Sequence, residues 1–341
     1  MIQRILLAPD GSASAERAAE FAASLGSRNG AKVTVLHVYS PAPSYMDRAI
    51  SSRKSRKRRS TSGNAEAALV AGITWPAGSS VCVLAVAPER LPLLGLSVDT
   101  QRMVDESLSD LHQQEWAVAE TLTTQVANRL RTHDLAVEVL VREGRPSEVI
   151  LEQAVAHSAD LIVIGAKGLS APDSFRLGAA AHKLAHYADC SVLVVRPPER
   201  AQLLSAILAS DGSPEAQRAA EFLCALSLPR WTEVKVVSVA DAKEGGLSGV
   251  SLPEYLRRTL FDAAKARADK MMQSLCDCGA HVRSAIRFGH PADEILAAAQ
   301  EQDADLIVVG ARGRTRAGPF RMGDVAQKVV KYASCSVLVV R

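Results

Sequence analysis

The chain of 341 residues is long enough for two domains of ordinary size, each with its own hydrophobic core. Its composition, 48% hydrophobic and only 4% aromatic, is typical of a parallel α/β protein. A formal net charge of +3 argues against a general nucleic-acid-binding protein. No apolar run approaches the roughly 20 residues of a membrane-spanning helix, so neither a nucleic acid nor a membrane is an expected partner.

The cysteines and the first residues of the chain indicate the cellular compartment of the protein. Six cysteines show no disulfide framework, and the pair Cys276 and Cys278 has no second pair that would complete a zinc site. The first residues, MIQRILLAPDG, lack the long apolar stretch of a signal peptide. Both features suit a reducing compartment, and we expect a cytoplasmic protein in which Cys190 and Cys335 are buried thiols.

The chain opens with the pattern of a β-α-β unit. An apolar strand is expected over residues 2–8, a helix over about 13–27 and a second strand over 33–39. Asp10 follows the first strand closely. Its carboxylate has two compatible interpretations, as a ligand contact and as an Asx-turn or cap ahead of the helix.

A basic segment interrupts this order. Residues 48–60 combine arginines and lysines with serines, which is typical of a solvated linker. A nucleic-acid role would rest on this segment alone, and no aromatic stacking platform accompanies it. Residues 63–86 then look like a second copy of the first helix and second strand, with Val81–Val86 matching Val33–Val38.

No second copy of the first strand precedes residue 63. We therefore interpret residues 1–47 as a partial unit, 61–198 as a first unit without its own first strand, and 202–341 as a complete second unit. A missing central strand would leave the backbone groups of its neighbours unpaired. We expect the strand at 2–8 to complete the sheet of the first unit.

The rest of the chain alternates between strands and helices. A long amphipathic helix is expected over 97–131 and a short one from Pro146. In the second unit, Asp211 repeats the position of Asp10. The expected elements of that unit are strands at 203–209, 234–239 and 282–288 and helices at 218–226 and 253–275. The alternation predicts an α/β fold with two doubly wound, parallel, five-stranded sheets of the Rossmann-like kind in tandem.

The strongest signal is a repeated segment. Residues 159–196 read ADLIVIGAKGLSAPDSFRLGAAAHKLAHYADCSVLVVR, and residues 304–341 read ADLIVVGARGRTRAGPFRMGDVAQKVVKYASCSVLVVR. A period of 145 positions indicates the duplication of a whole domain. The glycines in both copies follow the spacing G-x2-G-x9-G: Gly165, Gly168 and Gly178 in the first copy, and Gly310, Gly313 and Gly323 in the second.

Each glycine loop is expected between a buried strand and a helix. The two early glycines allow the backbone to turn tightly and to approach a ligand. The third glycine opens the helix, whose free N–H groups and dipole favour an anion such as phosphate. The alternative is that the glycines only shape a strand-to-helix turn. Two copies with one spacing favour a phosphate site in at least the ancestral unit.

The segment around this motif resembles the universal stress protein family in its tandem form. The resemblance covers nearly the whole chain, and it implies that the loop holds ATP or AMP, with Mg²⁺ as a candidate companion. It also implies adenosine contacts from Asp10 and Val38 in the first unit and from Asp211 and Val239 in the second. Basic side chains close to the loops would add positive charge: Lys167, Arg312, Arg314 and Arg316.

The chain departs from the family at the residue after the third glycine. A hydroxyl residue is usual there, but Ala179 and Asp324 take its place. Ala179 loses a phosphate hydrogen bond, a net loss of about 1 kcal/mol. Asp324 would repel phosphate unless a divalent cation bridged the two, so it is a candidate nucleotide contact only with such an ion. Its alternative role is a helix cap.

The motifs and their departures from the family leave three candidate functions. The first is a stress-response regulator that binds an adenine nucleotide in at least one unit. The second is a nucleotide-independent interaction or dimerisation module, which Ala179 and Asp324 favour. The third, an ATPase or kinase, lacks a P-loop lysine and a carboxylate–histidine constellation, so at most weak ATP hydrolysis is expected.

The last strand of each unit, SVLVVR, is short and apolar, and it would be an aggregation risk if exposed at a sheet edge. In the family this strand pairs across a dimer. We expect the two copies to pair within the chain as a pseudo-dimer, with a homodimer and an unidentified protein partner as further candidates.

Overall fold

The computed structural model describes residues 2–39, 71–74, 80–83, 98–168, 177–197, 205–226, 232–241, 253–276, 281–313 and 322–341. The basic segment 48–60, Arg314 and Arg316 lie outside these residues. The chain divides into two compact units, one of residues 1–38 and 120–341 and the other of residues 39–119. Within the described residues, no helix combines the length and the hydropathy needed to cross a membrane.

The larger unit contains two halves of the same design. The elements of the first half, in chain order, are β1 (Arg4–Ala8), α1 (Ala13–Asn29), β2 (Lys32–Tyr39), the end of α3 (Val98–Arg131), β5 (Val137–Glu143), α4 (Pro146–Ala156), β6 (Leu161–Gly165), α5 (Ala179–Tyr187) and β7 (Ser191–Val195). Those of the second half are β8 (Ser205–Ala209), α6 (Pro214–Ala225), β9 (Glu233–Ala240), α7 (Glu254–Cys276), β10 (His281–Phe288), α8 (Pro291–Glu301), β11 (Leu306–Gly310), α9 (Asp324–Tyr332) and β12 (Ser336–Val340).

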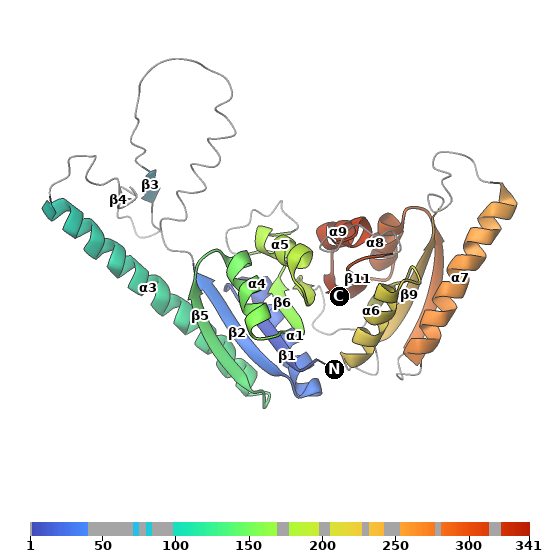
Figure 1. The fold of residues 1–341 in the computed structure, drawn as a ribbon, viewed down its shortest axis with the longest axis horizontal. Helices are drawn as coiled ribbons and strands as arrows, with labels where there is room; N and C mark the ends of the chain where they lie inside the picture. Colours follow the sequence, from blue (N-terminus) through green and yellow to red (C-terminus); the bar gives the residue numbers. More distant parts are fainter. Residues whose placement is uncertain are drawn as a thin grey trace, which may run out of the picture. The chain divides into compact units, whose positions relative to one another are not determined.

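The strands of both halves form one ten-stranded sheet in the order β10-β9-β8-β11-β12-β7-β6-β1-β2-β5 (Figure 1). Within each half, the strands on both sides of β1 and on both sides of β8 run parallel to them, and the order reverses beside β1 and beside β8, as in a doubly wound fold. β1 lies between β6 and β2, with Ile5 opposite both Leu161 and Val33. The segment before residue 40 therefore supplies two strands of the same sheet as β5, β6 and β7.

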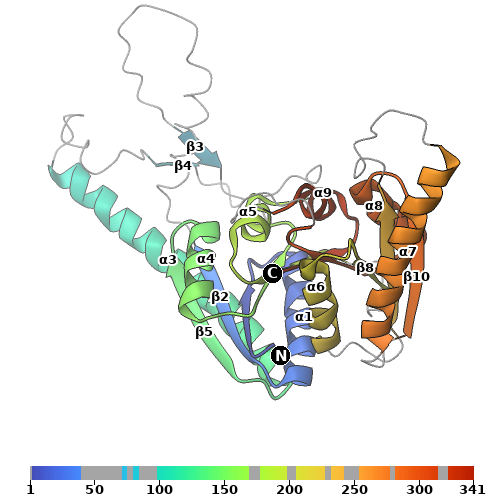
Figure 2. The ribbon, with the colours of Figure 1, turned by 45° about the vertical axis from the view of Figure 1, so that its right-hand side comes forward.

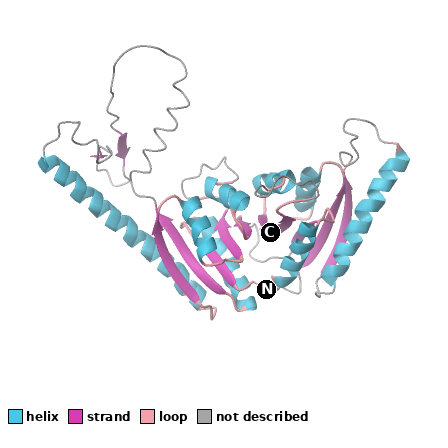
Figure 3. Ribbon diagram, viewed as in Figure 1, coloured by secondary structure: helices cyan, strands magenta, loops and turns pink. Residues whose placement is uncertain are grey.

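Helices cover both faces of this sheet (Figure 3). One buried cluster joins α1, α6, α7 and the end of α3 to residues such as Leu7 and Leu208. The other joins α4, α5, α8 and α9 to residues such as Leu6 and Ile207, one position away on the same strands. Because successive side chains of a strand point to opposite faces, the continuous apolar runs supply both cores at once.

The two SVLVVR strands meet at the centre of the sheet. β7 and β12 pair in antiparallel fashion, with Leu193 opposite Leu338. The expected two five-stranded sheets are thereby joined into one continuous sheet. α5 and α9 lie side by side on one face at this junction (Figure 2).

Two arginines bind the halves reciprocally at this junction. The guanidinium group of Arg196 donates to the backbone oxygens of Val330, at 2.6 Å, and Cys335, at 3.1 Å. That of Arg341 donates to the backbone oxygens of Ala185, at 2.8 Å, and His186, at 3.1 Å. Each arginine thus follows the last strand of one half and caps the final turn of a helix in the other half. Positive charge at a helix C-terminus also interacts favourably with the helix dipole.

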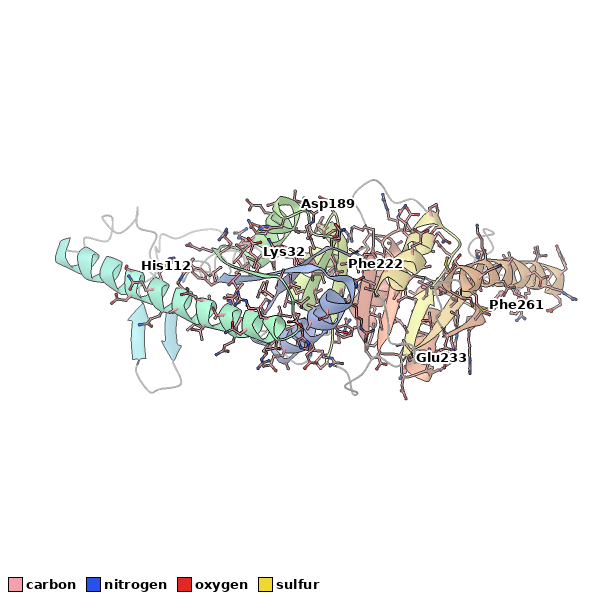
Figure 4. The ribbon with its side chains drawn as sticks, turned by 90° about the horizontal axis from the view of Figure 1, so that it is seen from below. Lys32, His112, Asp189, Phe222, Glu233 and Phe261 are labelled. Carbon is pink, nitrogen blue, oxygen red and sulfur yellow. The ribbon has the colours of Figure 1, made fainter. Side chains whose placement is uncertain are left out.

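Each half has an ion pair between two neighbouring strands, and the positions of the acid and the base are exchanged between the halves. Lys32 begins β2 and its Nζ lies 2.7 Å from Glu138 on β5. Glu233 begins β9 and lies 3.3 Å from Arg283 on β10. Figure 4 labels Lys32 and Glu233. The hydrogen bond from Lys32 lowers the pKa of the Glu138 carboxyl below its usual value. These pairs lie largely in solvent, where such contacts add little stability.

The smaller unit differs from the expectation that residues 63–86 repeat the first helix and second strand. β3 (Ala71–Thr74) and β4 (Ser80–Val83) form a separate antiparallel pair, with Ala71 opposite Val83. The described part of the copy at Val81–Val86, residues 81–83, is therefore not a second strand two of the large sheet. The physical reason is that β2 already occupies the place beside β1 and has β5 on its other side.

The cysteines fall into two chemical states. Cys190 and Cys335, the residues just before β7 and β12, are free thiols, and burial raises the pKa of each to about 11. Cys276 is a free, exposed cysteine. Cys224 of α6, in contrast, forms a disulfide bond, which the spacing of the cysteines does not predict.

We expect Arg196→Ala to lower the free energy of unfolding by about 2–3 kcal/mol, because it removes charged donors from two carbonyl groups at the junction. Arg341→Ala should have an effect of similar size. Urea denaturation monitored by circular dichroism measures both. The matched control is Arg283→Ala, an exposed ion-pair arginine that should cost about 0–1 kcal/mol. Equal effects of Arg196→Ala and the control would contradict a stabilising role of the reciprocal arginine contacts.

The rate of alkylation should distinguish the buried cysteines from the exposed one. With a pKa near 11 rather than 9.0, Cys190 and Cys335 should react with iodoacetamide about 100-fold more slowly at pH 8 than an unperturbed thiol, because only the thiolate attacks. Peptide mass spectrometry of the native protein measures each rate, with exposed Cys276 as the internal reference. Reaction of all three at one rate would be inconsistent with the raised pKa values.

Candidate functional site

The candidate sites lie where the strand order reverses in each half. In the first half, the carboxyl ends of β1, β2 and β6 meet at one edge of the sheet. In the second half, the corresponding strands are β8, β9 and β11. Ligands of doubly wound proteins bind at this edge. The predicted acids and the two early glycines of each loop follow these strands.

Asp10 is fixed against the second glycine of its loop. Its Oδ1 accepts hydrogen bonds from the backbone N–H of Ser12, at 3.0 Å, and from the Ser12 hydroxyl, at 2.6 Å. Its Oδ2 lies only 2.7 Å from the place that a Cβ on Gly168 would occupy. The Asx-turn and the placement beside the glycine loop therefore coexist, and the turn holds the carboxylate in position.

The start of α1 anchors the first glycine loop. The backbone oxygen of Lys167 accepts a hydrogen bond from the Ser14 hydroxyl at 2.6 Å, and the Ser12 hydroxyl, which shares its one proton with Asp10, lies 3.0 Å from the same oxygen. Ser12 is also the N-cap of α1, and its hydroxyl accepts from the N–H of Ala15 at 3.2 Å. The two serines thus connect the β1–α1 turn to the loop after β6.

Gly165 allows this helix to approach β6. A Cβ at this position would lie 2.7 Å from the Ser14 hydroxyl oxygen and 3.0 Å from the backbone nitrogen of Ala15. Gly310 has the same role against α6, since its Cβ would lie 3.0 Å from the backbone carbonyl carbon of Glu215. The first glycine of each loop therefore serves close helix–strand packing.

The third glycine of each loop begins a helix. Gly178 is the N-cap of α5 and donates its N–H to the backbone oxygen of Ala166 at 2.7 Å. Gly323 is the N-cap of α9 and donates to Ala311 at 2.8 Å. Neither helix start has a side-chain cap. The N-cap glycine therefore offers no side chain to the first N–H groups of either helix, which is an arrangement that favours an anion.

The substituted residues occupy the first helical positions. Ala179 begins α5 and Asp324 begins α9, and both side chains are exposed. Asp324 is an acid in a first helical turn, where a negative charge interacts favourably with the dipole. It does not act as an N-cap, since Gly323 holds that position.

The second half repeats the acid–glycine contact. Asp211 Oδ1 accepts from the N–H of Ser213 at 2.9 Å, and its Oδ2 lies 2.7 Å from the place of a Cβ on Gly313. Ser213 is the N-cap of α6. Glu215 stands at the position of Ser14, and an ionised carboxylate cannot donate the hydrogen bond with which Ser14 anchors the first loop.

The second half also has a contact that the sequence argument missed. Arg267 of α7 donates from Nη2 to the backbone oxygen of Val239, at 3.2 Å. Its Cδ lies 2.8 Å from the place of a Cβ on Gly212. In the first half, His37 Nδ1 lies 2.8 Å from the backbone oxygen of Pro9. The contact of Arg267 left no pattern in the sequence, because α7 and β9 are brought together only by the fold.

The structure thus places the predicted residues of each half as follows. Asp10 and Gly168 touch, as do Asp211 and Gly313. Val38 is half-buried and Val239 is buried at the ends of β2 and β9, next to the strands that precede the acids. Within the described part of the chain, no group of three or more acids, histidines or cysteines could hold a metal ion by itself.

The family model and several known proteins similar to this chain share one description. The model of the universal stress protein family matches residues 1–196 and 205–341. A universal stress protein of Mycolicibacterium smegmatis is 24% identical over 344 residues, covering 99% of this chain and 96% of that protein. One of Thermus aquaticus is 38% identical over 136 residues, covering 40% of this chain and 96% of that protein. The crystal structure of a universal stress protein from Archaeoglobus fulgidus shares the fold over 99% of this chain and 98% of that chain, with a TM-score of 0.60 and 17% identity.

The first and second glycines should respond differently to alanine. Gly165→Ala should lower the free energy of unfolding by about 1–3 kcal/mol, because the added Cβ meets the backbone of α1. Gly168→Ala meets only the end of the Asp10 side chain, which can rotate away, so its cost should be smaller. Thermal melting of both variants tests this order, and Gly310→Ala and Gly313→Ala repeat the comparison. A larger loss for Gly168→Ala would contradict it.

Proposed function

Since the chain belongs to the universal stress protein family, we propose that it is a stress-response regulator in which at least one half binds an adenine nucleotide, ATP or AMP. The observation that carries the proposal is the contact of an Asp carboxylate with the second glycine of each loop. It sets an acceptor for hydroxyl groups beside a backbone that a ligand can approach closely, at the edge where doubly wound folds bind ligands.

The parts of a nucleotide fit the proposed site in order. The ribose hydroxyls are donors, and the fixed carboxylate of Asp10 or Asp211 is their acceptor. The phosphates would lie at the start of α5 or α9, where the N-cap is a glycine and has no side chain to bond to the first N–H groups. Adenine would lie near the ends of β2 or β9, beside Val38 or Val239.

Mg²⁺ is part of the proposal in the second half. The ion is usually held by phosphate oxygens together with one or two carboxylates. Exposed Asp324 at the start of α9 would supply such a carboxylate. Without the ion, the same charge repels the phosphates. Any nucleotide binding that this half retains should therefore depend on the metal more strongly than binding in the first half, where Ala179 carries no charge.

The organisation of the chain supports a joint role of the halves. We propose that the larger unit acts as an internal pseudo-dimer, with a boundary between residues 197 and 205. The antiparallel pairing of β7 with β12 and the two reciprocal arginines support this view. An unidentified protein partner, a further homodimer and a cytoplasmic location complete the proposal.

A second candidate is a nucleotide-independent interaction module. The observation that favours it is the absence of a hydroxyl at both Ala179 and Asp324, which are exposed at the first helical positions. In that case the loops are relics of the family fold and serve only the packing of strand against helix.

Nucleotide content tests the two candidates. The protein is purified in Mg²⁺ and denatured, and the released nucleotide is quantified by chromatography. We expect ATP or AMP in the wild type. At least one of Gly168→Ala and Gly313→Ala should reduce binding of added nucleotide by about tenfold or more, because the displaced carboxylate no longer meets the ribose.

The controls separate a site effect from a loss of folding. Asp10→Asn removes the negative charge and replaces one acceptor oxygen by an N–H2 donor without adding volume, whereas Asp269→Asn changes the same charge at an exposed position of α7. Only the first should weaken binding. If the purified protein is empty and does not bind added ATP or AMP with Mg²⁺, the interaction module is the better interpretation.

A further inference from the structure

The two halves differ at the ends of the strands that would meet adenine. In the second half, Arg267 reaches from α7 to the end of β9 and donates to the backbone oxygen of Val239 at 3.2 Å. The stem of the same side chain packs over the turn after β8, with Cδ and Cγ at 2.8 and 3.0 Å from the place of a Cβ on Gly212. The side chain therefore spans the gap between the ends of β8 and β9.

The equivalent residue of the first half is Leu122. Arg267 and Leu122 are 145 positions apart, which is also the distance between the repeated glycines. The same offset relates Leu130 to Leu275, which are both fully buried in the core cluster under these helices. Leucine has no hydrogen-bond donor, so residue 122 cannot engage a strand carbonyl as Arg267 does.

This difference matters for an adenine base. Its amino group is a donor and needs an acceptor such as the carbonyl at the end of a strand, while its ring needs an apolar surface. Arg267 already donates to the Val239 carbonyl and brings a positive charge to the same place. A half-buried leucine supplies apolar surface and has no donor of its own for the strand carbonyl.

We propose that Arg267 closes the second half to adenine nucleotides. The chain then binds one nucleotide tightly, in the first half, while the side chain of Arg267 occupies the adenine position of the second half. The inference rests on the proposed function and adds to it the identity of the occupied half. Displacing a charged donor from its carbonyl should weaken the second-half site by about 10- to 100-fold relative to one without the arginine.

A reciprocal exchange of the two residues tests this assignment. Titration calorimetry with ATP and Mg²⁺ should give one tight site in the wild type and two in Arg267→Leu. Leu122→Arg should lose the tight site. The double exchange should again have one tight site, which Gly313→Ala now weakens and Gly168→Ala does not. Arg258→Leu, an exposed arginine on the same helix, is the matched control and should behave as the wild type.

Other results would overturn the assignment in distinguishable ways. Two equal sites in the wild type, or one site in Arg267→Leu, would refute the closing role while the proposed function stands. Weaker binding in Arg267→Leu would show instead that the guanidinium contacts the nucleotide. Binding by none of these variants would refute the proposed function and the assignment together. Arg267→Ala replaces Arg267→Leu if a melting curve shows that the leucine variant is unfolded.

Discussion

The antiparallel pairing of β7 with β12 is the constraint on which the rest of the larger unit depends. Each of these strands has a parallel neighbour from its own half on one side and the other half on the other side. Their backbone groups are therefore paired twice, which removes an apolar sheet edge from solvent. The arginines that follow them fasten α9 and α5 to the opposite half. Strand pairing and helix capping thus come from the same six-residue repeat.

The candidate sites lie at the carboxyl ends of the strands, and they depend on how closely helices approach the sheet. Gly165 and Gly310 bring α1 and α6 against β6 and β11, and this approach sets Asp10 and Asp211 onto the next glycines. The two halves share this skeleton but differ in its fastening. Serine hydroxyls tie the first loop to α1, whereas Glu215 stands at the corresponding place in the second half. A duplicated fold can therefore retain its geometry while its two sites diverge.

Much of the fold follows from local patterns, because apolar runs, glycine spacing and helical periodicity are visible in single segments. The α/β class could be predicted in this way, and the glycine motif pointed to the family. The contact between the two last strands was an implication of that resemblance. β1 lies beside β6, where the argument from unpaired backbone groups places it. In contrast, Val81–Val86 resembles a strand of the sheet, but its described residues 81–83 pair with β3 instead. A local pattern does not show that β2 already occupies the place beside β1. Arg267 was missed because its partner, Val239, is a backbone carbonyl on another element.

The smaller unit is inserted in the sequence between β2 and β5. The entropy of loop closure gives the free-energy cost of this longer connection. The chain leaves β2 at residue 39 and returns at residue 137, a span of 98 positions, whereas β9 and β10 are only 41 positions apart, from 240 to 281. For a flexible loop, this difference costs about 0.8 kcal/mol. The connection between the second and third strands is therefore a place where this fold can gain a whole segment with little loss of stability.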